Sequence, residues 1–156
     1  MRQPVPFFLS YAHSDAGDVD RFRAAFEPLL KSAAPYEFGG WMDRQILPGE
    51  QWRTEIDEAL QHARFGLLFL SPDFLTSAFI TQNELPVLLA KAMVVPVELQ
   101  RLLFDGTLDL KGLGQRQVFR DSKGRSFDGC RSMPARRAFA RELFTKLIAL
   151  LKKYPC

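Results

Sequence analysis

Short apolar runs alternate with amphipathic stretches along this chain. The runs at residues 5–10 and 65–70 are apolar on both faces, which is typical of strands buried inside a parallel sheet. Residues 36–42 and 93–97 predict two further strands, although Gly39 and Gly40 interrupt the first of these. A short edge strand is predicted at residues 117–119.

The stretches between these runs have helical spacing. Apolar residues recur every three or four positions over residues 19–33, with Asp18 as the predicted N-cap, and again over residues 52–63. Residues 71–73 are predicted to turn the chain, and a helix is predicted over residues 81–90. Pro134 is predicted to open the last helix.

This order of elements predicts an α/β fold. We expect one domain over residues 1–153, with a flavodoxin-like three-layer architecture: a central parallel sheet in the order 2-1-3-4-5, flanked by helices. Such sheets bind ligands where the strand order reverses, beyond the carboxyl ends of the strands. Here those ends are residues 10–13 and 71–73, so the sequence predicts a ligand site between them.

The lengths of the apolar runs and the number of cysteines indicate in which cellular compartment the protein works. Apolar residues make up 47% of the 156, yet no apolar run is long enough to cross a bilayer, and no secretory leader is visible. Cys130 and Cys156 are the only cysteines. A cytoplasmic, reducing location is therefore expected, with no membrane partner and no structural disulfide.

Charge is distributed unevenly. Residues 1–110 carry 9 basic and 15 acidic side chains, whereas residues 111–156 carry 12 basic and 3 acidic ones. We interpret the basic segment mainly as a solvated helix face and a polar loop. Few aromatic residues lie among its charges, so nucleic acid is not directly expected as a partner. The alternative is self-association, with the basic end of one copy against the acidic body of the next.

Three motifs carry a resemblance to a known family. They are residues 8–15 (FLSYAHSD), residues 41–52 with Leu47-Pro48-Gly49, and residues 70–77 (LSPDFLTS) followed by Asn83-Glu84-Leu85. In this order and spacing they resemble the TIR (Toll/interleukin receptor) domain, in a form similar to bacterial members. The resemblance covers roughly residues 5–98.

The resemblance implies an activity. Some TIR domains hydrolyse NAD at the nicotinamide–ribosyl bond and release ADP-ribose or its cyclic form, often as toxic effectors in bacterial anti-phage defence. Glu84 corresponds to the family's catalytic glutamate. One carboxylate suffices because the bound nicotinamide ring is already cationic, so it leaves as a neutral molecule and needs no general acid.

The resemblance also implies substrate contacts and an assembly loop. Where many members have a tryptophan one turn before the glutamate, this chain has Ile80, with Phe79 as the nearest aromatic residue. His13 is the only basic group in the first turn and supplies charge only when protonated. The implied substrate-binding residues are Ser10, Tyr11, Ala12, His13, Asp43, Ser71 and Phe79. The implied assembly loop is Ile46, Leu47, Pro48 and Gly49.

These implications define the expected partners and the alternatives. NAD is expected as substrate and not as cofactor, because no Gly-rich phosphate fingerprint follows a strand. No metal site is expected, since the histidines and cysteines lack ligand spacing. Other copies of the domain, and a fused or separate sensor domain, are the expected protein partners.

The chain is consistent with a standalone protein or with the N-terminal effector part of a longer one. A non-enzymatic TIR adaptor and a nucleoside deoxyribosyltransferase on the same architecture remain as alternatives.

Overall fold

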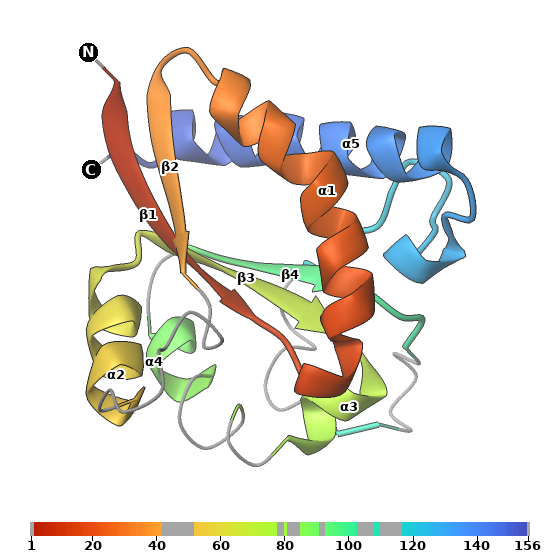
Figure 1. Ribbon diagram of the computed structural model, residues 1–156, viewed down its shortest axis with the longest axis horizontal. Coiled ribbons are helices and arrows are strands. Elements are labelled where there is room, and N and C mark those ends of the chain that lie inside the picture. The colour runs from red at the N-terminus through yellow and green to blue at the C-terminus, as the bar shows by residue number, and fades with distance from the viewer. Residues whose placement is uncertain are drawn as a thin grey trace.

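A parallel sheet forms the centre of the molecule. The computed structural model describes residues 2–41, 52–77, 80, 85–90, 93–102, 108–109 and 117–155. Four strands pair in the order β2-β1-β3-β4 (Figure 1). They are β1 (Gln3–Ser10), β2 (Tyr36–Trp41), β3 (Phe65–Leu70) and β4 (Val94–Glu98). This arrangement confirms the predicted flavodoxin-like α/β fold, with small shifts in the bounds of β1 and β4.

The predicted fifth strand is reduced to one contact. Phe119 forms an isolated parallel bridge with Val97 of β4. Its N–H donates to Pro96 O at 2.8 Å, and its carbonyl accepts from Glu98 N at 3.1 Å. The chain therefore passes the fifth position in the predicted direction, but it does not continue along β4 as a strand.

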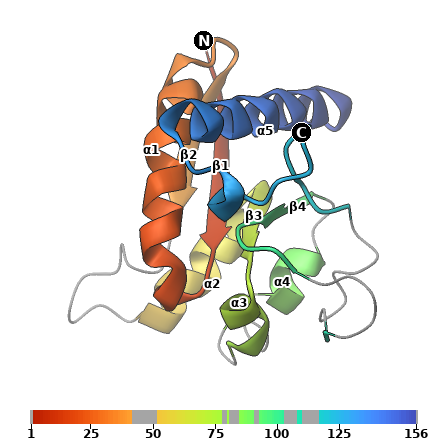
Figure 2. The same ribbon diagram turned by 90° about the vertical axis from the view of Figure 1, so that its right-hand side faces the viewer.

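Helices cover both faces of the sheet. Figures 1 and 2 show α1 and α5 on one face, and α2 and α4 on the other. Successive β1 side chains alternate between these layers: Phe7 and Leu9 pack towards α1 and α5, whereas Phe8 packs towards the opposite face. The helices are α1 (Ala16–Ser32), α2 (Trp52–His62), α3 (Pro72–Thr76), α4 (Leu85–Leu89) and α5 (Met133–Lys153), with 3₁₀ turns η1 (His13–Asp15) and η5 (Phe127–Gly129).

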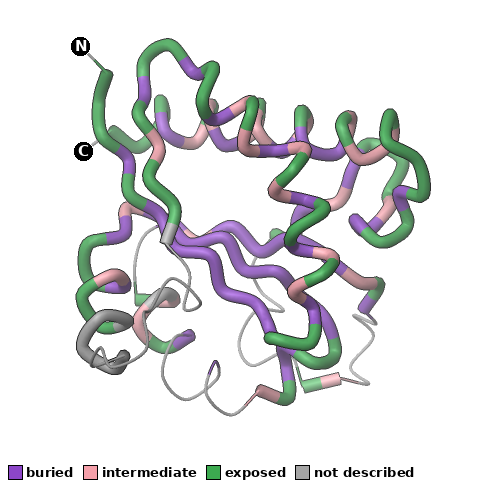
Figure 3. The backbone as a smooth tube through the Cα atoms, in the orientation of Figure 1, coloured by how far each residue is buried: buried purple, intermediate pink, exposed green. Residues whose placement is uncertain are grey.

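Phenylalanine rings fill the layer between β3 and the helices α1 and α5. Figure 3 shows the burial of the central strands, and every residue of β3 is buried. The ring of Phe22 lies 4.8 Å from that of Phe26, 5.1 Å from Phe69 and 5.5 Å from Phe127, between ring centroids. Phe139 of α5 meets the same ring edge-on at 6.4 Å. Phe22 thus joins α1, β3, η5 and α5 in one aromatic cluster.

The first helix begins earlier than predicted. Asp18 is not the N-cap: it lies in the first turn of α1, where its carboxylate accepts from Arg21 at 2.8 Å. The 3₁₀ turn η1 leads directly into the helix, and Asp15 N donates to Ala12 O at 2.9 Å. The chain therefore needs no separate cap at position 18.

A helix also replaces the turn predicted at residues 71–73. Ser71 is the N-cap of α3, and its Oγ accepts from Phe74 N at 3.0 Å. Pro72 lies at the start of this helix, where a missing N–H costs nothing. Of the helix predicted over residues 81–90, the structure describes α4; residues 81–84 lie outside the described residues.

The loop before α5 contributes to the core, which its polar sequence did not indicate. Phe127 and Cys130 are both buried in the layer beneath α5, and Cys130 is a free thiol. Asp121 orders this loop by accepting from the N–H groups of Lys123 at 3.0 Å and Arg125 at 2.7 Å. α5 then starts at Met133, one residue before the predicted Pro134, with Ser132 as its cap.

The two ends of the chain lie at the same pole of the molecule, beside the amino ends of the strands (Figure 1). Arg64 immediately precedes β3, and its Nη2 donates to the carbonyl oxygen of Tyr154 at 2.7 Å. Its backbone N–H donates to Pro6 O of β1 at 2.7 Å. The segment after α5 is therefore held against the start of the sheet.

Removing the central ring should test the aromatic cluster. Phe22→Ala is expected to lower the free energy of unfolding by about 3–5 kcal/mol, because a fully buried ring is lost and its four aromatic neighbours cannot close the space. Phe144→Ala, which removes a half-buried ring at the margin of the same layer, should cost clearly less. Urea unfolding of both variants measures this difference, and equal losses would contradict a central role for Phe22.

Candidate functional site

The strand order reverses at β1, and the candidate site lies there. β2 pairs with one side of β1 and β3 with the other, so the connections leaving β1 and β3 diverge at their carboxyl ends. In open α/β sheets this divergence leaves a crevice that the strands and helices do not fill. The predicted location of the site is therefore a feature of the observed topology.

A hollow of about 350 Å³ occupies this position. We call it the switch-point hollow. One wall is the turn after β1, and the other is α3 with the residues that follow it. Its described lining residues are Tyr11, Ala12, His13, Ser14, Asp73, Thr76, Ser77 and Ile80. Three predicted substrate-binding residues, Tyr11, Ala12 and His13, thus come together here.

These three residues present different chemistry to the hollow. Tyr11 and Ala12 are buried and pack into the cores on opposite faces of the sheet, so each forms a fixed wall. His13 is exposed and opens η1. Across the hollow, Ser14 Oγ donates to Asp73 Oδ2 at 2.8 Å and links the two walls. The site combines an apolar side, an exposed imidazole and several hydroxyl groups.

A buried carboxylate, Asp15, supports the turn from beneath. It accepts from Ser71 Oγ, at the end of β3, and from Gln100 Nε2 at 3.2 Å, just beyond β4. Only 3% of Asp15 is exposed, so these donors replace lost hydration. Asp15 therefore ties the carboxyl ends of three strands together. The sequence analysis did not assign Asp15 or Gln100 a role, because they are 85 residues apart.

The two predicted serines lie beneath the hollow. Ser10 and Ser71 are both fully buried, and neither is among the described residues that line it. Ser71 has two structural hydrogen bonds, to Asp15 and from Phe74 N. Their contact with a substrate stays a prediction.

The remaining predicted residues lie outside the described residues. These are the catalytic Glu84, the substrate-binding Asp43 and Phe79, and the assembly loop Ile46, Leu47, Pro48 and Gly49. Two described neighbours define the surroundings of Glu84 in the sequence. Ile80 lines the switch-point hollow, and Leu85 is buried in the same apolar cluster as Ile80.

A second buried carboxylate lies at the end of β4. Glu98 is fully buried, and its Oε2 accepts from Arg120 Nη2 at 3.0 Å and from Leu102 N at 3.4 Å. Arg101 Nε lies 3.6 Å from Oε1. Because Arg120 follows Phe119, this charge pair holds the reduced fifth strand beside β4. The predicted strand ended at Val97, so the sequence analysis missed this acidic residue.

The described part of the chain contains neither a metal-binding cluster nor a membrane-spanning helix. No group of three or more histidine, cysteine, aspartate or glutamate side chains there has the arrangement needed to hold a metal ion. Within the same residues, no helix is both long and apolar enough to span a membrane.

Asp15 should make the stability of the fold depend on pH. Burial raises the pKa of its carboxyl group, the Ser71 hydrogen bond opposes this, and the nearby charges of Asp73 and Asp18 add to it. The folded state therefore binds the Asp15 proton more tightly than the unfolded state, so ionised Asp15 costs stability at neutral pH and this cost is relieved as pH falls.

Asp15→Asn removes this titration. The stability of the wild type relative to Asp15→Asn is expected to increase from neutral pH to about pH 4. Urea unfolding across this range, with the exposed Asp57→Asn as the matched control, measures the change. A wild-type stability that decreases relative to Asp15→Asn as the pH is lowered would contradict the assigned direction.

Comparison with known proteins agrees with the topology and with the three motifs. A family model described as TIR domain matches residues 7–131. This match extends from β1 through the bridge at Phe119 to the end of the loop before α5. A search of curated proteins finds no match. The match spans well over half of the sequence, and the chain belongs to the TIR domain family.

Proposed function

We propose that this TIR domain cleaves NAD at the nicotinamide–ribosyl bond, with Glu84 as the catalytic carboxylate. The observation that carries the proposal is the switch-point hollow, a partly polar cavity formed by the first TIR motif on one side and the third motif on the other. Because the topology alone leaves a crevice here, the proposal depends on the residues that line it and on the two motifs that supply them.

The proposed reaction needs little acid–base chemistry. Heterolysis of the C–N bond returns the bonding electrons to the pyridinium nitrogen, so nicotinamide leaves as a neutral molecule and the positive charge passes to the ribose. A carboxylate held against that carbon stabilises the charge electrostatically. Water then attacks to give ADP-ribose, or the adenine of the same molecule attacks to give a cyclic product.

The described walls suit the two halves of such a substrate. Tyr11 and Ile80 offer an apolar surface for a flat ring, and hydroxyl groups of Thr76 and Ser77 lie beside it. His13, when protonated, offers the only positive side chain among the described lining residues for a phosphate. Asp15 holds the turn that carries Tyr11 and His13, so it is a positioning residue in this proposal.

The size of the hollow favours activation by assembly. About 350 Å³ lies at the low end for a drug-sized ligand, and NAD is larger than most such ligands. The described walls therefore hold only part of the substrate. We propose that a second copy, through residues 46–49, supplies further contacts, and that a fused or separate sensor domain controls this assembly in bacterial defence.

Replacing the carboxylate tests the central assignment. Glu84→Gln is expected to reduce release of nicotinamide from NAD by about 100-fold or more, because the charge that stabilises the ribosyl cation is lost. The assay uses concentrated, assembled protein. Glu37→Gln, an exposed substitution near the amino end of β2, is the matched control and should keep wild-type turnover.

The outcomes separate this proposal from the alternatives. Wild-type turnover by assembled Glu84→Gln would refute Glu84 as the catalytic group. If the assembled wild type releases no nicotinamide, the adaptor function is favoured instead. Cleavage of deoxynucleosides in preference to NAD would favour a deoxyribosyltransferase.

Blocking the hollow tests where the substrate binds. Thr76→Trp places a large ring at an exposed position on the wall of the switch-point hollow, and it is expected to raise KM for NAD by about tenfold. Thr145→Trp on α5 is the matched control, because both threonines are exposed and donate from Oγ1 to a helix carbonyl four residues earlier. An unchanged KM for Thr76→Trp would show that NAD does not use this hollow.

A further inference from the structure

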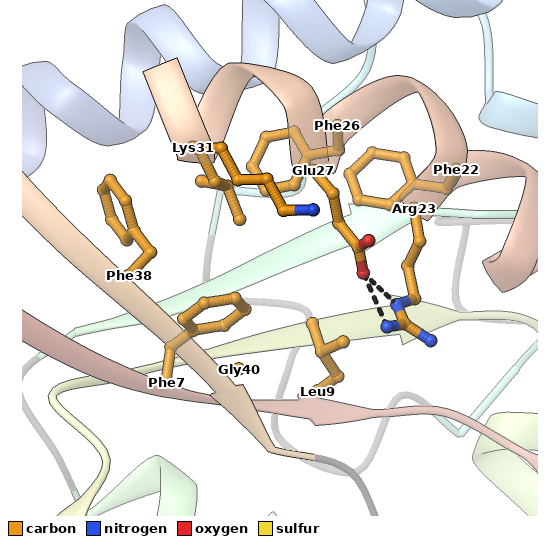
Figure 4. A pocket seen from close by; sticks show the side chains of 10 residues that line it. Phe7, Leu9, Phe22, Arg23, Phe26, Glu27, Lys31, Phe38 and Gly40 are labelled. Carbon is orange, nitrogen blue, oxygen red and sulfur yellow. Dashed lines mark hydrogen bonds and ion pairs between the residues drawn. The ribbon is translucent and has the colours of Figure 1, made fainter. Parts of the chain in front are cut away.

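A second hollow lies between α1 and the outer part of the sheet, away from the residues that line the switch-point hollow. We call it the aromatic hollow (Figure 4). Its volume is about 220 Å³. The apolar lining comes from β1, β2 and α1, and consists of Phe7, Leu9, Phe22, Phe26, Leu30 and Phe38.

The glycine at position 40 explains why this space is not filled. Gly40 pairs with Phe7 across the two strands, so a side chain at either position would point to the same face. A Cβ at Gly40 would lie 2.8 Å from the Phe7 ring, which is too close for a carbon contact. The ring of Phe7 is fixed by stacking on Phe65 at 5.0 Å and cannot turn aside freely. β2 therefore leaves the α1 side of the sheet open here.

Three charged residues of α1 form the rim of the aromatic hollow. Arg23, Glu27 and Lys31 are spaced four residues apart, so they follow one side of the helix. Arg23 Nε donates to Glu27 Oε1 at 2.7 Å, which balances these two charges. Figure 4 shows the Lys31 side chain extending over the hollow. Within the described residues, Lys31 makes no ion pair, so the described part of the rim carries one unbalanced positive charge.

Size and charge together select a class of ligand. An apolar cavity of about 150 Å³ admits a benzene molecule, so the aromatic hollow has room for one ring and a short substituent. The rings of Phe7 and Phe38 meet edge-on at 6.2 Å, and such walls favour stacked or edge-on contact with another aromatic ring. Lys31 favours an anionic group on the substituent.

We propose that the aromatic hollow is a binding site for a small aromatic carboxylate. The ring lies among the phenylalanines of β1, β2 and α1, and the carboxylate accepts from Lys31 Nζ at the rim. This site is separate from the proposed NAD site and does not depend on NAD cleavage. Leu9, on its wall, lies two residues before Tyr11 of the switch-point hollow on the same strand path.

A set of matched probes tests the proposal on the full chain. Phenylacetate, 2-phenylethanol and 2-phenylethylamine share one ring and differ in charge. Titration into isotope-labelled protein, followed by backbone amide shifts, is expected to move residues of the aromatic hollow most strongly with phenylacetate. The neutral and cationic probes should bind more weakly.

Two substitutions identify the groups responsible. Lys31→Gln is expected to weaken phenylacetate binding by about two- to fivefold, since Lys31 is exposed and its charge is screened by solvent. Lys152→Gln, also an exposed lysine in the last turn of its helix, is the matched control and should bind as the wild type does.

Phe38→Trp enlarges a half-buried ring on the wall and is expected to abolish binding. Phe144→Trp makes the same change at a half-buried ring on α5 outside the hollow, and it should leave binding intact. Phenylacetate binding that survives Phe38→Trp, or shifts that occur elsewhere, would overturn the site. Equal binding of 2-phenylethanol and no effect of Lys31→Gln would overturn the choice of an anionic ligand.

Discussion

A carboxylate removed from water needs hydrogen-bond donors, and those of Asp15 lie just beyond the ends of two other strands. Ser71 and Gln100 donate to it from the ends of β3 and β4, while its own backbone closes the turn after β1. The geometry of the switch-point hollow depends on this constraint, because the hollow is the space between the turn and α3. Ionised Asp15 opposes folding by its burial, yet it fixes the turn on which the proposed substrate contacts lie.

Local pattern was enough to predict most of the fold. The run at β3 is apolar on both faces and is buried on both, and the helical spacing of Phe22, Phe26 and Leu30 gives the buried stripe of α1. The errors had two causes, one local and one distant. Asp18 looked like a cap, but η1 already starts the helix. The loop containing Phe127 looked polar, but the Phe22 cluster draws that ring into the core.

The candidate site was predicted only in part, because contacts between distant residues also shape it. Its location followed from the strand order, and Tyr11, Ala12 and His13 do line a hollow there. The residues that hold it together, Asp15 and Gln100, are brought near each other only by the completed sheet. No periodicity or short motif encodes such a pair. The role proposed for Glu84 rests on the family resemblance of the third motif.

The contact made by Arg64 helps to determine where an attached chain would leave the molecule. Arg64 holds Tyr154 beside the start of β3, and the amino end of β1 lies at the same pole (Figure 1). The switch-point hollow lies at the carboxyl ends of the strands. A second domain or an affinity tag joined to either end would therefore attach at the pole opposite the switch-point hollow. In the proposed assembly, such an appendage would act by setting the spacing and orientation of neighbouring copies, because its point of attachment lies away from the hollow of its own copy.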